Sequence, residues 1–176
     1  MKHLKGDLLK FAREGAFDVI AHGCNCFCTM GAGIAKSIAA SFPQALAADR
    51  QTIKGDRGKL GTCTCAEVIS AHGILIVVNA YTQFDFRGAG TKANYDAIRS
   101  CMRWIARTFP GKRIGLPRIG AGLAGGDCQP SKRSSPRSWR PTRSPLSSSS
   151  PDHAETRHPV AMRRQRRSLR FDLIVP

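Results

Sequence analysis

The sequence has no signal peptide and no apolar run long enough to cross a membrane. These absences favour a cytoplasmic protein without a membrane partner, in which thiols stay reduced. The 7 cysteines are odd in number. Cys24, Cys26 and Cys28 alternate with other residues and lack the spacing of roughly two to four residues that is usual between zinc ligands. We therefore expect free structural thiols and no cofactor, with a zinc site as the alternative.

Acidic residues are scarce, and residues 129–150, where Ser, Arg and Pro dominate, contain none. The formal net charge of +16 divides evenly, because residues 1–127 hold 17 Lys/Arg and 9 Asp/Glu whereas residues 128–176 hold 11 and 3. The first part is typical of a mildly basic globular domain that suits an anionic ligand. The composition of the second part predicts disorder. We therefore divide the chain into a domain, residues 1–127, and a tail, residues 128–176.

Apolar residues of the first part alternate between strand-like and helix-like spacing, which is typical of an α/β layer fold. The β-branched run Ile74–Ala80 predicts the central strand, and Asn94–Phe109 has the apolar spacing of a long helix that Pro110 and Gly111 end. Ligands of such folds bind at the carboxyl ends of the strands. Further strands are expected at residues 1–4, 17–22, 62–69 and 114–116, and further helices at 8–12, 33–42 and 44–53.

Two glycine-rich turns follow predicted strands, at residues 30–35 and 117–127. Glycine leaves no Cβ between the backbone amides and a ligand, so each turn can present N–H groups to a phosphate. The first turn leads into a predicted helix, whose N-terminus attracts anions. Two such loops facing each other would hold a diphosphate from both sides.

Four motifs resemble those of a macro domain in their order and spacing. They are Leu4-Lys5-Gly6-Asp7, His22-Gly23-Cys24-Asn25, Met30-Gly31-Ala32-Gly33-Ile34-Ala35 and Pro117-Arg118-Ile119-Gly120-Ala121-Gly122-Leu123. The resemblance covers residues 1–127 and is strongest to the small phosphatase-like members of the family. It implies a three-layer α/β/α fold with a mixed central sheet and an ADP-ribose cleft. The expected partner is therefore ADP-ribose, or a small molecule or macromolecule that carries it.

The resemblance also implies binding roles for single residues. Asp7 is expected to accept a hydrogen bond from the adenine amino group, and it can be a helix N-cap at the same time. Asn25 is expected to bind the distal ribose, although by itself it is a typical turn residue. Outside the family each glycine loop is an ordinary turn. The first implied diphosphate loop is Gly31, Ala32, Gly33 and Ile34, and the second is Gly120, Ala121, Gly122 and Leu123.

The phosphatase-like members are thought to use a histidine before the Cys-Asn pair and an aspartate after the second loop, and His22 and Asp127 hold those positions. A histidine can act as nucleophile or acid–base group near neutrality, and a carboxylate can orient it or activate water. The alternatives are a backbone-bonded histidine and a helix N-cap. The deADP-ribosylating members use a lysine near the end of the central strand, but residues 79–83 contain none. We expect hydrolysis of ADP-ribose 1''-phosphate or of an ADP-ribosyl bond, with a non-catalytic ADP-ribose-binding module as the alternative.

The tail departs from the family pattern at Cys128, where relatives have Trp, then an amphipathic helix and a final strand. A DNA sequence can be written for residues 128–148 that encodes such a helix and a β-branched strand once a single guanine is restored in the Cys128 codon. We interpret the tail as a frameshift product that deprives the domain of its last helix and strand, and in which only Leu169–Val175 can form a strand. The alternative is a basic tail that binds nucleic acid.

Overall fold

The computed structural model describes residues 2–117, 119 and 171–175, which form an α/β fold. A mixed four-stranded sheet has the order β3-β4-β2-β5, and a two-stranded sheet pairs β1 with β6. The strands are β1 (Lys2–Gly6), β2 (Val19–Asn25), β3 (Cys63–Ser70), β4 (Gly73–Gln83), β5 (Ile114–Gly115) and β6 (Phe171–Val175). The helices are α1 (Leu8–Arg13), α2 (Gly33–Ser41), α3 (Pro43–Arg50) and α4 (Tyr95–Thr108), with a 3₁₀ turn η1 at Arg57–Lys59.

Local signals explain where the helices begin. Asp7 caps α1, and Asn94 caps α4 by accepting a bond from the Ala97 amide at 2.9 Å. Pro43 begins α3, a position that suits its fixed φ and its missing N–H. The helices and strands predicted between residues 2 and 116 are confirmed, with bounds that shift at their ends, whereas η1 was not predicted.

β2 lies between β4 and β5 and runs parallel to both. Val19 is opposite Ile76 and Ile114 in this pairing, and His22 is opposite Asn79. β3 runs antiparallel to β4. Because β2, β4 and β5 are parallel, their carboxyl ends meet at one edge of the sheet, which we call the carboxyl edge.

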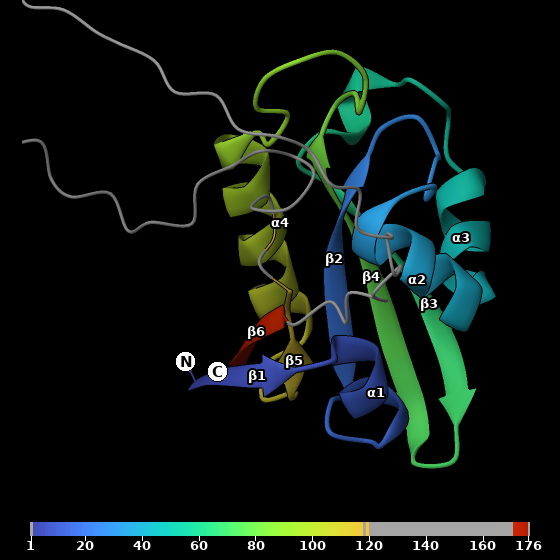
Figure 1. Cartoon of the computed structure of the whole chain (residues 1–176), viewed down its shortest axis with the longest axis vertical. Helices are drawn as coiled ribbons and strands as arrows, with labels where there is room; N and C mark the ends of the chain where they lie inside the picture. The colour runs from blue at the N-terminus through green and yellow to red at the C-terminus, as the bar shows by residue number, and fades with distance from the viewer. Residues whose placement is uncertain (1, 118, 120–170, 176) are drawn as a thin grey trace, which may run out of the picture. The chain divides into compact units, whose positions relative to one another are not determined.

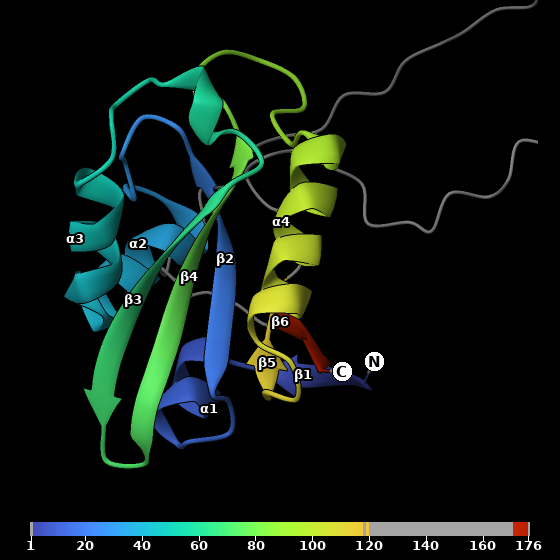
Figure 2. The same cartoon turned by 180° about the vertical axis from the view of Figure 1, so that it is seen from behind.

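Helices cover both faces of the four-stranded sheet, with α2 and α3 on one side and α4 on the other (Figures 1 and 2). An apolar cluster fills the space on each side. Side chains of β2 alternate between the two, since Ile20 and Cys24 join the cluster under α1–α3 whereas Val19 and Ala21 join the one under α4. This layering confirms the predicted α/β fold with a mixed sheet flanked by helices.

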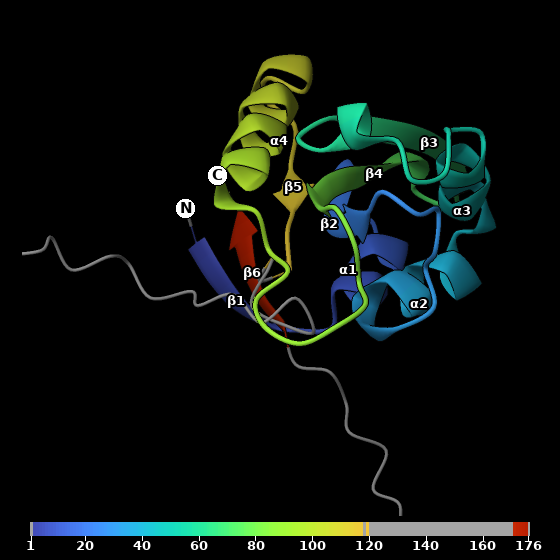
Figure 3. The same cartoon turned by 90° about the horizontal axis from the view of Figure 1, so that it is seen from above.

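The tail contributes one described strand. β6 runs antiparallel to β1, with Lys2 opposite Val175 and Gly6 opposite Phe171, and Figure 3 shows the two strands side by side. β6 lies within residues 169–175, the one tail segment that the sequence allows to form a strand, and it pairs with the backbone groups that β1 would otherwise leave open. Residues 120–170, which include most of the tail and its predicted disorder, lie outside the described residues.

None of the helices in the described part of the chain is long and apolar enough to span a membrane.

Candidate functional site

β2 ends at Asn25, where the chain turns at the carboxyl edge. The Asn25 side chain is buried and holds this turn. Its Oδ1 accepts bonds from the Phe27 amide at 2.8 Å and the Thr29 hydroxyl at 3.1 Å, and its Nδ2 donates to the Thr29 carbonyl at 2.9 Å. These contacts correspond to the turn role that the residue type alone predicts. An amide nitrogen carries two hydrogens, so Nδ2 retains one for a ligand.

The first glycine loop leads from this turn into α2. Gly31, Ala32 and Gly33 are exposed, and Ile34 is half-buried. The N-cap residue is Ala32, whose side chain has no oxygen to accept a bond from the amides of the first turn, and that turn contains no acidic residue. A Cβ added at Gly31 would meet no atom within 4 Å. Within the described residues the positive end of α2 therefore has no side-chain cap, and its first residues are exposed, an arrangement that favours an anion.

Asp7 lies between β1 and α1 and is exposed. Its Oδ1 accepts bonds from the Leu9 amide at 2.8 Å and the Lys10 amide at 3.2 Å, so the predicted N-cap is confirmed. Both of these bonds go to Oδ1. Oδ2 can therefore accept a further hydrogen bond from a ligand while the cap is kept.

His22 lies on β2, three residues before Asn25, and is completely buried. Its Nε2 is 2.9 Å from Oδ1 of Asn79, and the Cys24 sulphur is 3.7 Å from the ring. The Asn79 Nδ2 donates to the Ala45 carbonyl at 2.8 Å, which leaves Oδ1 as the acceptor for His22. Desolvation disfavours the imidazolium more than the Asn79 bond favours it, and this lowers the pKa of His22 to about 4. The imidazole is therefore neutral near pH 7.

The second glycine loop, Gly120–Leu123, and Asp127 lie outside the described residues. Ile119 is the last described residue before that loop. A Cβ added at Gly23 would lie 3.4 Å from Cγ2 of Ile119 and 2.6 Å from Oγ1 of Thr82. Gly23 thus leaves room for the Thr82 hydroxyl on β4, and Ile119 lies in ordinary contact distance of the same position.

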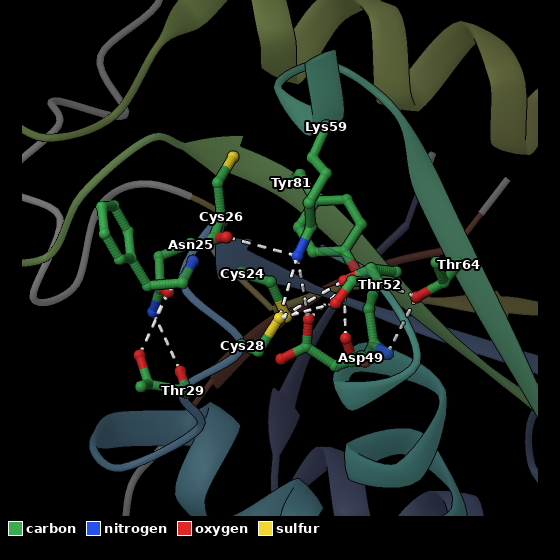
Figure 4. Close-up of polar contacts among 12 residues, drawn as sticks. Cys24, Asn25, Cys26, Cys28, Thr29, Asp49, Thr52, Lys59, Thr64 and Tyr81 are labelled. Atoms are coloured by element: carbon green, nitrogen blue, oxygen red, sulfur yellow. Dashed lines mark hydrogen bonds and ion pairs between the residues drawn. The ribbon is translucent and has the colours of Figure 1, made fainter. Parts of the chain in front are cut away.

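A buried polar network behind the Asn25 turn was not predicted (Figure 4). The Lys59 ammonium, which is 6% exposed, donates to the Cys26 carbonyl at 3.3 Å and lies 3.6 Å from Oδ1 of Asp49. The Tyr81 hydroxyl donates to the same Oδ1 at 3.0 Å. Charged side chains are rarely buried unless they are paired. The network therefore links the turn after Asn25 to α3 and η1.

Aromatic and cationic side chains lie close to the same turn. The Phe27 and Phe84 rings meet edge to face with centroids 5.3 Å apart. The Arg57 guanidinium lies 4.1 Å from the Phe84 centroid, and that of Arg87 lies 4.8 Å from the Phe27 centroid. Asp85 neutralises part of this charge through its ion pair with Arg87 at 2.8 Å. The arrangement places cations beside aromatic faces and near Asn25, which suits an anionic ligand.

The sequence model of the macro domain family matches residues 21–134. A curated relative, the uncharacterised 17.5 kDa protein from the tk-vs intergenic region of Enterobacteria phage T4, is 39% identical over 132 residues, which cover 72% of this chain and 82% of the phage protein. These two findings agree with the motifs and with the layered fold.

Solved structures show the same fold. A protein of unknown function from Bacteroides thetaiotaomicron has a TM-score of 0.58 and 27% identity over 70% of this chain and 80% of that chain. The DarG macrodomain of Mycobacterium tuberculosis has a TM-score of 0.56 and 20% identity over 72% and 80%. Thermosipho africanus DarTG, solved in complex with ADP-ribose, has a TM-score of 0.54 and 18% identity over 68% of this chain and 33% of that one. The chain belongs to the macro domain family.

Proposed function

We propose that this chain binds ADP-ribose at the carboxyl edge, with the diphosphate on the first glycine loop. The observation that carries the proposal is the N-terminus of α2, whose amides have no acceptor on Ala32 and lie just after the Asn25 turn. Asn25 retains one hydrogen to donate to the distal ribose, and Asp7 retains Oδ2 for the adenine amino group. Gly31–Ile34 and Gly120–Leu123 form the two diphosphate loops of the proposal. Thermosipho africanus DarTG, which shares the fold, supports it through its bound ADP-ribose.

The proposal extends to hydrolysis of ADP-ribose 1''-phosphate or of an ADP-ribosyl bond, with His22 and Asp127 as the reacting pair. A neutral imidazole can accept a proton or attack phosphorus, and Asp127 can orient it or activate water. Since His22 is completely buried, direct participation requires that its ring become accessible to the substrate.

The burial of His22 favours a second candidate, a module that binds ADP-ribose without catalysis. In this function His22 only supports the end of β2 through its bond to Asn79. The two candidates share the binding site and differ in turnover alone.

Phosphate release from ADP-ribose 1''-phosphate tests the catalytic proposal. Wild-type protein is expected to release phosphate, whereas His22→Gln and Asp127→Asn are expected to lose release and retain ADP-ribose binding. Asp96→Asn is the matched control, because Asp96 is exposed on α4 and pairs there with Arg99. Release that survives both substitutions would overturn the assignment of the reacting pair. Binding without any release of phosphate or of ADP-ribose from an ADP-ribosylated substrate would establish the binding module.

A further inference from the structure

Cys28 is held against a lysine within the turn that follows Asn25. Its sulphur accepts a hydrogen bond from the Lys59 ammonium at 3.2 Å and lies 3.3 Å from Oγ1 of Thr52. Cys28 has a φ of +56°, the single positive value outside glycine in the described part of the chain. Such a backbone conformation is unfavourable for a side chain with a Cβ and persists where the surrounding structure imposes it. The fold therefore fixes the sulphur and the amine in contact, as Figure 4 shows.

Asp49 gives this pair a neighbouring proton acceptor. Its side chain is 1% exposed, and Oδ1 faces Lys59 at 3.6 Å. Its Oδ2 is buried and has no hydrogen-bond partner among the described residues. A buried carboxylate oxygen without a partner is uncommon, since desolvating it without a hydrogen bond is costly. The Cys28 sulphur, the Lys59 amine and a carboxylate with an oxygen that can still accept a proton thus lie together.

We propose that Cys28 and Lys59 are a modification site, at which a peroxide joins Sγ to Nζ in a reversible sulfenamide bond. The Cys28 thiolate first attacks the peroxide, so that its sulphur becomes a sulfenic acid and the second peroxide oxygen leaves as water or alcohol. Lys59 then gives up a proton, with Asp49 as the first acceptor, and its nitrogen attacks the sulphur. The sulfenic oxygen departs as water when the S–N bond forms. Sulphur loses two electrons, the peroxide gains them, and a thiol reductant returns both to restore thiol and amine.

Three other cysteines of the described part of the chain lack this combination. Cys24 is buried against His22, and Cys26 is completely buried, with its sulphur donating to the Gln83 carbonyl. Cys65 is exposed on β3, and no lysine contacts its sulphur among the described residues. Among the cysteines that the structure describes, Cys28 is the one that combines partial exposure, which admits a small peroxide, with an amine already in contact.

The bond would change the turn that carries Asn25. The sulfenamide nitrogen is neutral, so Asp49 no longer faces a positive charge. Because the S–N bond draws the Lys59 nitrogen toward Cys28, the hydrogen bond from Lys59 to the Cys26 carbonyl is lost. Thr29, which follows Cys28, provides two of the three hydrogen bonds of the Asn25 side chain. Oxidation is therefore expected to weaken ADP-ribose binding, an expectation that rests on the proposed function.

Mass spectrometry of the full chain after hydrogen peroxide treatment and proteolysis tests the bond. We expect peptides with Cys28 and Lys59 joined and lighter by two hydrogen atoms, and their release by a thiol reductant. Cys28→Ser and Lys59→Arg are each expected to abolish the joined peptide. Cys65 serves as an internal control, because its oxidation should give no lysine adduct. Oxidation of Cys28 to sulfinic acid or a disulfide, with Lys59 unmodified in the folded wild-type protein, would overturn the proposal.

ADP-ribose titration before and after peroxide tests the regulatory consequence. Affinity is expected to fall by roughly tenfold, a typical size for coupled sites, and to return with the reductant. In Cys28→Ser it should not respond to peroxide. An unchanged affinity in protein shown to carry the bond would contradict the regulation. If the reduced protein binds no ADP-ribose, the proposed function fails, whereas the bond is still decided by the mass of the joined peptides.

Discussion

The burial of His22 makes the stability of the fold depend on pH. The pKa of His22 is about 4 in the folded chain, against 6.5 for an unperturbed histidine, so the unfolded chain binds more protons between these values. The contribution of the neutral His22 ring to the free energy of unfolding is fully present above pH 6.5 and is lost as the pH falls toward about 4. A gap of about 2.5 pKa units, at about 1.36 kcal/mol each, amounts to about 3 kcal/mol. The whole free energy of unfolding of a typical domain is only about 5–15 kcal/mol, so this contribution is a large part of it.

Urea unfolding followed by circular dichroism, at pH 7 and near pH 4.5, measures this contribution. Other carboxylates titrate in the same range, so the comparison is with His22→Gln, whose amide can donate to Asn79 but does not ionise. The wild-type free energy of unfolding is expected to fall by a further 2–3 kcal/mol or so relative to the variant. His72→Gln, at an exposed position, controls for the substitution itself. Parallel pH profiles for wild type and His22→Gln would refute the reasoning.

Three further predictions concern stability and binding. Lys59→Met should lower the free energy of unfolding by about 3–5 kcal/mol, because Asp49 stays buried without a cation. The exposed Lys10→Met should change it by at most about 0.5 kcal/mol. Equal effects of the two substitutions in urea unfolding would contradict the buried ion pair. Asp7→Ser should weaken ADP-ribose binding with an unchanged unfolding midpoint, whereas Asp7→Ala should also lose about 1 kcal/mol of cap stability; unaltered affinity in both would exclude the adenine contact. Restoring one base in the Cys128 codon should raise the unfolding midpoint, and resequencing that confirms the present frame, with a protease-resistant tail, would contradict the frameshift.

Periodicity predicted the described helices and strands well, since their signals are local. The β-branched run of β4 and the apolar spacing of α4 identify a strand and a helix without any knowledge of their partners. Strand order depends on pairing between distant segments, which no local pattern encodes. β6 illustrates this: its sequence allowed a strand, but only the structure pairs it with β1.

The candidate site was predictable where a side chain bonds to backbone groups a few residues away in the sequence. Asp7 and Asn25 are polar residues at element ends, and both form the cap and turn that their types favour. The Asp49–Lys59 pair was missed because an acidic residue in a helix and a lysine in a turn are ordinarily exposed. Their burial follows from how α3 and η1 pack around Tyr81, which involves residues far apart in the chain.

Calorimetric titration of ADP-ribose into the full chain tests the central claim most directly. The account predicts saturable one-to-one binding that weakens when Gly33→Val places a side chain at the first diphosphate loop, where φ is +55°. Gly73→Val, at the β3–β4 hairpin with a φ of +106°, controls for backbone strain away from the site and should leave binding intact. Absence of ADP-ribose binding by a chain that circular dichroism shows to be folded would contradict the account.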